Sequence, residues 1–327
     1  MSTNTSDLLE MYKKMALIRT AEETLLKLFE QSEMPGFIHS YIGEEATGVG
    51  VCHALRKGDL ITSTHRGHGH VIAKGGDLNL FFAELYGKAS GYCKGKGGSM
   101  HIADLDLGIL GANGIVGGGI PIAAGAALAA KMRQSSKVSV AFFGDGATDI
   151  GAFHESLNLA AVWELPVVFV AENNGFADFI RVSDHQKIDR ISQRAQAYAM
   201  AGETVDGNDV EVVYAAARTA IERARRGGGP TLLECVTYRW RGHYEGDPQP
   251  YRSLEEVEEW KGRDPLKLAE GRLKQRGELD PAGRTAIWDD IRARVDAAVA
   301  FARQAAPPRP ESALEDVYTD LEEEGWR

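Results

Sequence analysis

Two uninterrupted apolar runs, each ending in a polar turn, constrain the fold of this chain most. The first is VSVAFFGDG at 138–146 and the second is PVVFVAENNG at 166–175, with the helical pattern AFHESLNLAAVWEL between them. Continuous apolar strands, unlike strands of alternating polarity, are typical of a parallel sheet that is covered on both faces. The pattern therefore predicts an α/β fold, a parallel sheet with helices on both faces.

Flanking segments add helices at both ends of this fold. Apolar residues at three- and four-residue steps predict a long N-terminal helix that stops at Pro35-Gly36. The sequence also predicts a helix over 43–57, a strand over 60–64, an Ala/Gly helix after it, a helix over 210–226 and a strand over 230–240. We expect an α/β domain with an N-terminal helical arm over 1–260, C-terminal helices over 261–306 and a Pro-bounded acidic tail over 307–327.

Composition excludes several classes of protein. Lys and Arg total 37 against 47 Asp and Glu, and the net charge of −10 with scattered basic residues argues against nucleic acid as a partner. The longest apolar stretch, 120–130, is far shorter than the ~20 residues of a membrane span, and no basic-then-apolar leader is visible, so we expect a cytoplasmic location. The three cysteines form no C-x-x-C pair and predict free thiols.

The segment 87–119 is unusually rich in glycine, with 11 glycines among 33 residues. Such density is typical of a flexible linker, or of a loop whose backbone approaches a ligand closely. Apolar residues and His101 interrupt the glycines, which favours an ordered binding loop. Three histidines, His65, His68 and His70, cluster just before it, in the segment THRGHGH.

The strongest chemical signal is Gly144-Asp145-Gly146 followed, after 26 residues, by Asn173-Asn174. Successive parallel strands end at the same edge of a sheet, so we expect Asp145 and Asn174 to converge there. Each half alone is an ordinary turn or helix cap. Together, a carboxylate and a carboxamide are oxygen ligands that suit Mg²⁺ and a diphosphate. The acid inside the turn does not match a dinucleotide-binding G-x-G-x-x-G fingerprint.

With these motifs, the chain resembles the α subunit of the thiamine-diphosphate-dependent first component of 2-oxo acid dehydrogenase complexes, and the acetoin dehydrogenase type most closely. The resemblance covers about residues 8–260 through STHRGHGHVIAKG, KGKGGSMHIADLDLGILGANGIVGGGIP, FFGDG, FHESLNLAAVWELPVVFVAENNG, TVDGNDV, GPTLLE and YRWRGHYEGDPQPYR. It implies the thiamine-diphosphate-binding fold, with thiamine diphosphate and Mg²⁺ as cofactors.

The resemblance also implies roles for individual residues. Asp145, the Asn174 side chain and the Phe176 carbonyl would hold Mg²⁺, although the family more often has Tyr at 176. Diphosphate and rings of the cofactor would be contacted by a set of small, apolar and basic residues: His65, Arg66, Gly114, Ile115, Val116, Gly146, Ala147 and His243. The same resemblance makes His65, His39 and His243 the expected catalytic histidines, His39 on the substrate side and His243 on a mobile loop.

The implied reaction cleaves the carbon–carbon bond of acetoin and passes the acyl unit to a lipoyl group on an acyltransferase. A β subunit is expected, as α₂β₂, because the chain shows no second parallel α/β domain to hold the rest of the cofactor. Two departures from the family pattern, Ala147–Gly151 and Phe176–Arg181, leave alternatives open. These are a subunit acting on pyruvate or a branched-chain 2-oxo acid, and a cofactor-binding paralogue without turnover.

Overall fold

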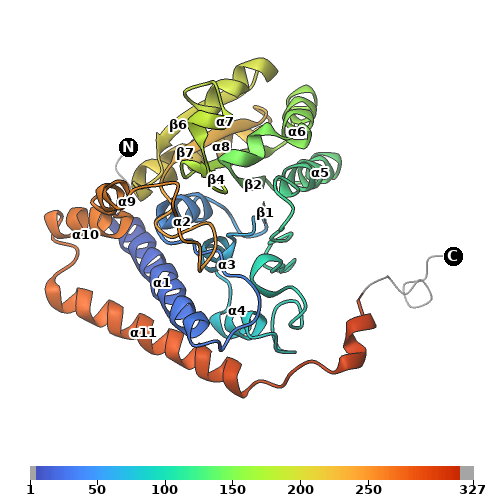
Figure 1. Cartoon of the computed structure of the whole chain (residues 1–327). Helices are drawn as coiled ribbons and strands as arrows, with labels where there is room; N and C mark the ends of the chain where they lie inside the picture. Colours follow the sequence, from blue (N-terminus) through green and yellow to red (C-terminus); the bar gives the residue numbers. More distant parts are fainter. Residues whose placement is uncertain (1–4, 317–327) are drawn as a thin grey trace.

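The computed structural model describes residues 5–316 and confirms the predicted fold class. Five strands form a sheet in the order β1-β2-β3-β7-β6, and every neighbouring pair is parallel (Figure 1). The strands are β1 (Leu60–Thr62), β2 (Ser139–Gly144), β3 (Val167–Asn173), β6 (Ala201–Asp206) and β7 (Thr231–Val236), and the short hairpin strands are β4 (Phe176–Ala177) and β5 (Ile180–Arg181).

Helices alternate with these strands along the chain. The α-helices are α1 (Thr5–Glu30), α2 (Glu45–His53), α3 (His68–Lys74), α4 (Leu78–Leu85), α5 (Gly119–Met132), α6 (Gly151–Val162), α7 (Val182–His185), α8 (Val210–Arg225), α9 (Leu254–Lys261), α10 (Pro265–Gln275) and α11 (Pro281–Gln304). The 3₁₀ turns are η1 (Gly98–Met100), η2 (Asp145–Asp149), η3 (Ile191–Tyr198) and η4 (Pro310–Leu314).

The two faces of the sheet are covered by different helices. The side chains on one face point into a large core that they share with α1, α2, α3 and α8. These side chains include Val140, Phe142, Val168 and Val170. The alternate residues of the same strands pack against α5 and α6. Since successive side chains of a strand point to opposite faces, burial on both sides requires the uninterrupted apolar runs seen in the sequence.

The N-terminal helix α1 is buried on most of its surface. The side chains of Leu8, Met11, Met15, Ile18 and Leu25 are almost fully buried, and α1 packs against α2, α3, α10 and α11. Figure 1 shows α11 running alongside α1 and reaching α4. The C-terminal helices therefore cover α1 and contribute to the core.

Some elements differ from the sequence prediction in their bounds, and one was not predicted. The second helix is shorter than predicted, because it spans Glu45–His53 within the expected 43–57. The last strand ends at Val236, although the apolar and aromatic run continues to Trp240. Edge strand β6 was not predicted, because its residues are partly exposed and polar, and an edge strand needs no continuous apolar run.

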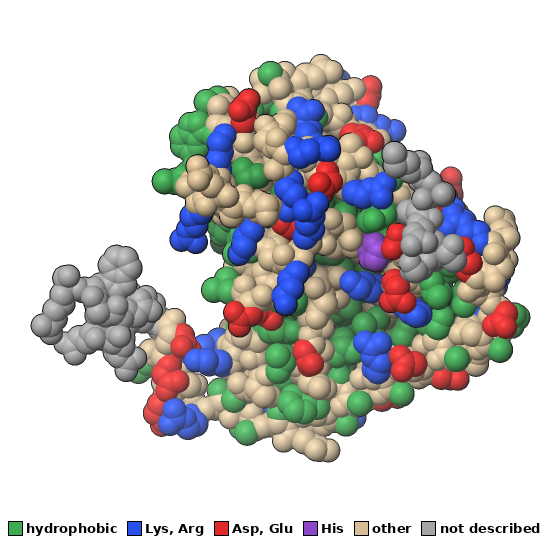
Figure 2. Space-filling view, turned by 180° about the vertical axis from the view of Figure 1, so that it is seen from behind, with side chains coloured by type: hydrophobic (Ala, Val, Ile, Leu, Met, Phe, Trp, Pro, Cys, Tyr) green, Lys and Arg blue, Asp and Glu red, His purple; other side chains and the backbone are tan. Residues whose placement is uncertain are grey.

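Several further expectations concern the whole chain. Cys52, Cys93 and Cys235 are free thiols, as predicted. None of the helices in the described part of the chain is long and apolar enough to span a bilayer. Acidic and basic side chains both occur across the face drawn in Figure 2. The acidic tail lies outside the described residues from 317 onward, and the predicted domain boundaries stay a prediction.

Candidate functional site

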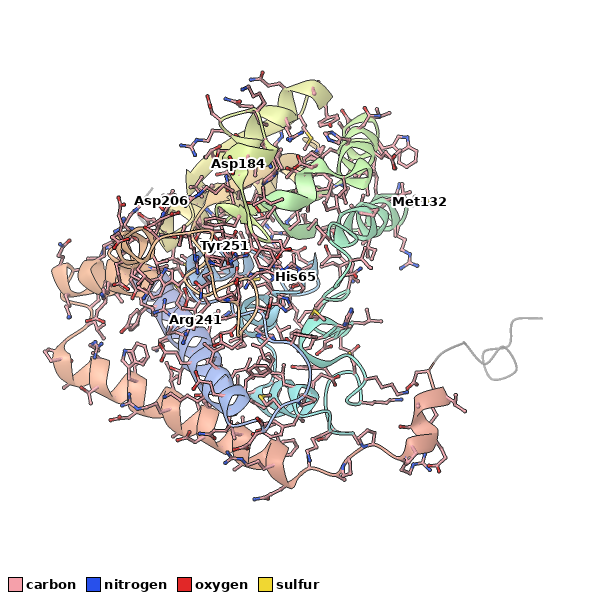
Figure 3. All side chains as sticks on the ribbon, viewed as in Figure 1. His65, Met132, Asp184, Asp206, Arg241 and Tyr251 are labelled. Carbon is pink, nitrogen blue, oxygen red and sulfur yellow. The ribbon has the colours of Figure 1, made fainter. Side chains whose placement is uncertain are left out.

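A cavity of about 370 Å³ opens at the carboxyl ends of β2 and β3, the edge where open α/β sheets bind ligands. All of the predicted site residues line it: His39, His65, Arg66, Gly114, Ile115, Val116, Asp145, Gly146, Ala147, Asn174, Phe176 and His243. Figure 3 shows His65 near the centre of the molecule, between the sheet and the helical layer below it. The structure thus brings together residues that are up to 204 positions apart in the sequence.

Asp145 lies at the corner of the cavity where the sequence predicts a metal site. Strand β2 ends at Gly144, and the carboxylate of Asp145 accepts a hydrogen bond from the Gly146 backbone N–H at 2.9 Å through Oδ1. Its second oxygen, Oδ2, is buried and has no hydrogen-bond partner. Burial raises the pKa of Asp145 to about 6, because the ionised carboxylate has lost its water without gaining a cation. This corner fits a divalent metal ion.

Asn174 lies opposite, in the turn that follows β3. Gly175 has φ +90°, a left-handed conformation that glycine adopts without strain, and it turns the chain so that the Phe176 N–H donates to Asn174 Oδ1 at 3.3 Å. The amide nitrogen, on the other side of the Asn174 carboxamide, donates to the buried carboxylate of Glu44. Asp145, Asn174 and Phe176 all line the cavity, and carboxylate, carboxamide and backbone carbonyl oxygens are the hard donors that Mg²⁺ prefers.

Two buried arginines give the cavity a positively charged wall. The Arg66 guanidinium donates to the carbonyls of Ser40 at 2.6 Å and His243 at 3.1 Å, and its Nε lies 3.7 Å from a Glu44 oxygen. The Arg239 guanidinium donates to the Asp178 carbonyl at 2.9 Å. Burial and the nearby Arg239 charge lower the pKa of Arg66 to about 10, which still leaves it charged at neutral pH. Such a wall suits an anion such as a diphosphate.

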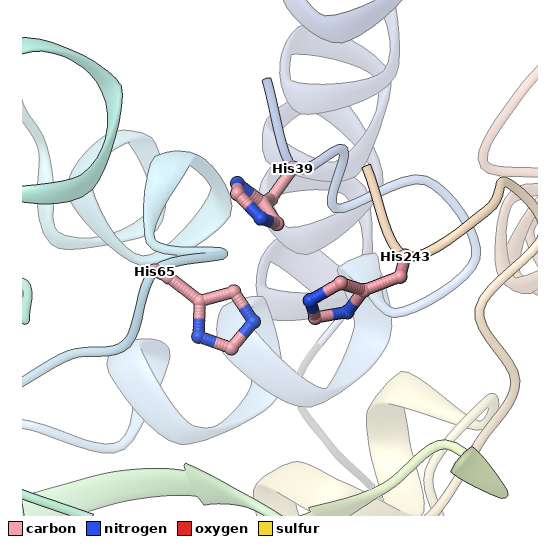
Figure 4. Close-up of side chains that lie close together, drawn as sticks. All are labelled: His39, His65 and His243. Carbon is pink, nitrogen blue, oxygen red and sulfur yellow. The ribbon is translucent and has the colours of Figure 1, made fainter. Parts of the chain in front are cut away.

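The three predicted histidines, His39, His65 and His243, face one another in the cavity (Figure 4). Their ring centroids are 4.9 to 5.5 Å apart, and the rings meet edge to face. Burial and the charge of Arg66 lower the pKa to about 3 for His39, about 2 for His65 and about 4 for His243. All three imidazoles are therefore neutral near pH 7 and are able to accept a proton.

The proton position on His243 follows from its neighbours. An Arg239 N–H points at Nδ1 from 3.4 Å, and a guanidinium only donates, so Nδ1 is the acceptor. The opposite nitrogen, Nε2, lies 3.3 Å from Asp178 and carries the proton. The His243 backbone N–H donates to Asp247 at 2.8 Å, and Asp247 also accepts from Tyr251. The loop that carries this histidine is therefore held by its own side chains.

The glycine-rich segment is an ordered loop, as the sequence predicts. The buried Glu84 carboxylate of α4 accepts hydrogen bonds from four of its backbone N–H groups, at Cys93, Gly95, Gly97 and Gly98. Further along the loop, Ile115 and Val116 are 72 % and 50 % exposed at the cavity rim. Large exposed apolar side chains at the rim of such a cavity are positioned for contact with the rings of a ligand.

Several of the residues that depart from the family pattern contact groups other than Asp145 and Asn174. Asp149 pairs with His185 at 2.5 Å and Arg194 at 3.0 Å, at the end of η2 remote from Asp145. Residues 176–181 form the β4–β5 hairpin, which Arg181 anchors to Glu256. The Phe176 ring packs between Tyr238 and Tyr251. Asp145 and Asn174 line the same cavity in the presence of these changes.

Sequence reasoning missed three charged residues of the cavity, Glu44, Glu172 and Arg239. Glu172 is the clearest case, because it interrupts the apolar run of β3 and its buried carboxylate pairs with His70 at 3.0 Å. A charged residue inside a buried strand costs free energy unless it is paired, and this was the signal available in the sequence. Glu44 lies in the predicted 43–57 helix and Arg239 in the YRWRGHYEGDPQPYR motif, but neither pattern marks the residue as part of the cavity.

The chain belongs to the dehydrogenase E1 component family, whose model matches residues 13–311. This family comprises the thiamine-diphosphate-dependent dehydrogenase subunits that the sequence motifs resemble. The chain is 54% identical over 316 residues to the α subunit of acetoin:2,6-dichlorophenolindophenol oxidoreductase from Bacillus subtilis, covering 96% of this chain and 94% of that protein.

Other relatives span nearly the same length. The corresponding α subunit from Cupriavidus necator is 50% identical over 312 residues, covering 95% of this chain and 94% of its own. The pyruvate dehydrogenase E1 component α subunit of Rhizobium meliloti is 40% identical over 316 residues, covering 96% and 90%.

Proposed function

We propose that this chain is the α subunit of an acetoin dehydrogenase and that it binds thiamine diphosphate through Mg²⁺. Asp145 and Asn174, with the Phe176 carbonyl, would hold the metal, and Arg66 and the backbone at Gly146 and Ala147 would hold the diphosphate. The observation that carries this proposal is the buried, unpartnered oxygen of Asp145 on the cavity wall beside Asn174. A buried carboxylate oxygen without a donor is costly unless a cation satisfies it.

Bound thiamine diphosphate supplies an electron sink for the carbanion that forms when a carbon–carbon bond next to a carbonyl breaks. Gly114, Ile115 and Val116 would support its rings from the rim. The neutral imidazoles of His39, His65 and His243 would accept and return protons at the substrate, since their lowered pKa values keep them unprotonated at neutral pH. Arg66 and Arg239 would neutralise the diphosphate from the opposite wall.

Acetoin is the proposed substrate, because the acetoin-type relatives from two organisms share more identity with the chain than the pyruvate-type relative does. We expect the assembled enzyme to reduce an artificial dye with a higher kcat/KM for acetoin than for pyruvate or a branched-chain 2-oxo acid. A higher kcat/KM for pyruvate would assign the chain to the alternative class. No turnover with any of the three would favour a cofactor-binding paralogue.

A β subunit is the proposed partner, in an α₂β₂ assembly, with a lipoyl-bearing acyltransferase as the acceptor of the acyl unit. Residues 5–316 contain one parallel α/β sheet, and its cavity opens at the edge where a second domain would cover the cofactor. We expect the isolated chain to be inactive and to gain turnover when it is purified together with its β chain. Mass photometry would give the stoichiometry, and full activity of the isolated chain would refute the proposal.

A further inference from the structure

We propose that Glu44 is a positioning residue for the metal site, and that it fixes the Asn174 carboxamide with its oxygen toward the cavity. This inference rests on the proposed function, because it assumes that Asn174 binds Mg²⁺. Glu44 is not itself a proposed ligand. Its side chain contacts both Asn174 and Arg66.

A carboxamide ligand has an orientation problem. Its oxygen and its nitrogen exchange places when the group rotates by half a turn, and only the oxygen binds a metal ion. The two arrangements have nearly the same shape, so packing alone does not distinguish them. A neighbour that accepts hydrogen bonds at one side of the group does distinguish them, because the amide nitrogen must then face that neighbour.

Glu44 supplies this acceptor. Both of its carboxylate oxygens lie within hydrogen-bond distance of Asn174 Nδ2, at 3.2 and 3.3 Å. Because either oxygen accepts from the amide, the orientation of the Asn174 carboxamide does not depend on which Glu44 oxygen faces Nδ2. The Phe176 N–H donates to Asn174 Oδ1 at 3.3 Å and favours the same orientation through one contact, whereas Glu44 offers two acceptor oxygens on the nitrogen side.

The location of Glu44 supports a dedicated role. It occupies the N-cap position of α2, yet its side chain makes no capping hydrogen bond. Its carboxylate is instead directed into the cavity wall, where its side chain is 1 % exposed and Arg66 Nε lies 3.7 Å away. Glu44 thus connects the proposed metal ligand with the proposed diphosphate-binding arginine, and burying a carboxylate there carries a free-energy cost.

The neighbouring asparagine provides a matched comparison within the same chain. Asn173 donates from Nδ2 to the buried carboxylate of Glu234 at 2.8 Å, and Glu234 also accepts from the Ser192 backbone and the Thr204 hydroxyl. This second Asn–Glu pair does not line the cavity. Consecutive residues of one strand end therefore form two similar pairs, of which only the Asn174–Glu44 pair faces the proposed metal.

Two substitutions separate reach from charge. Glu44→Gln keeps the length of the side chain and an acceptor oxygen but removes the charge, whereas Glu44→Asp keeps the charge and withdraws the oxygens by one methylene. Gln presents a donor as well as an acceptor to Asn174, and Asp withdraws both oxygens. A positioning role therefore predicts that E44Q and E44D each raise the dissociation constant for the metal roughly 10- to 100-fold, as is typical of lost outer-shell partners. Glu234→Asp is the control and is expected to leave metal affinity unchanged.

The measurement is a Mn²⁺ titration of the assembled α and β chains with thiamine diphosphate present, in which EPR reports free Mn²⁺ in place of Mg²⁺. A thermal melt of each variant identifies any protein that has not folded, and E44Q alone still tests the proposal if E44D does not fold. Metal affinity unchanged in either variant would overturn the positioning role, and loss in E44Q alone would indicate a role for the charge of Glu44 instead. Absence of Mn²⁺ binding by the parent enzyme would instead refute the proposed function.

Discussion

Replacing Asp145 with Asn should weaken metal binding and at the same time stabilise the metal-free protein. The pKa of Asp145 is raised from 3.8 to about 6 by burial, and 1.36 kcal/mol corresponds to each tenfold change in proton affinity. Above pH 6 the ionised carboxylate therefore destabilises the folded state by ~3 kcal/mol relative to the unfolded chain. Asn removes this charge and keeps the acceptor for the Gly146 N–H, but it leaves an amide without a partner, which costs about 1–3 kcal/mol, so we expect a net gain of about 0–2 kcal/mol.

Urea unfolding at pH 7.5 without divalent ions, at one protein concentration, would measure the gain, and calorimetric titration with Mg²⁺ and thiamine diphosphate would measure the loss of affinity. The matched control is Asp149→Asn on the same turn, since Asp149 is paired with His185 and Arg194 and should show no such gain. A destabilised D145N protein would refute the account of its buried charge. Unchanged affinity for the metal would refute its assignment as a ligand.

Two further predictions concern other buried groups. In the unfolded chain His65 takes up a proton near pH 6.5, whereas the folded side chain, with a pKa of about 2, does not. The free energy of unfolding therefore falls as the pH drops below 6.5, and His65 accounts for about 2–3 kcal/mol of this loss at pH 4.5. The His65→Gln variant should therefore show a shallower dependence of unfolding free energy on pH between 6.5 and 4.5, and an unchanged slope would contradict the shift. The Glu84→Gln substitution should lower the free energy of unfolding by about 2–4 kcal/mol, because an amide N–H replaces an acceptor oxygen among four backbone donors. Hydrogen exchange over residues 91–98 should quicken in E84Q, and exchange as slow as in the parent would argue against this anchor.

The sequence was sufficient to predict the central part of the fold and the meeting of Asp145 and Asn174 at one edge of the sheet. The apolar runs before Gly144 and Asn173 require strands that are buried on both faces, and consecutive parallel strands joined by one helix place their carboxyl ends together. Asp145 and Asn174 lie near each other for this reason alone, and the structure confirms that they share a cavity. Asp145 and Asn174 are separated by 29 positions, a distance over which local periodicity still defines the topology.

Other features depended on tertiary structure, because they join segments that no local pattern relates. His39, His65 and His243 meet only because the loop before α2, the loop after β1 and the chain beyond β7 converge on the same edge of the sheet. Burial of α1 beneath α11 likewise depends on long-range packing. Glu44 shows the physical reason most clearly: its sequence position is that of a helix cap, and only the approach of Asn174 and Arg66 gives its carboxylate another partner.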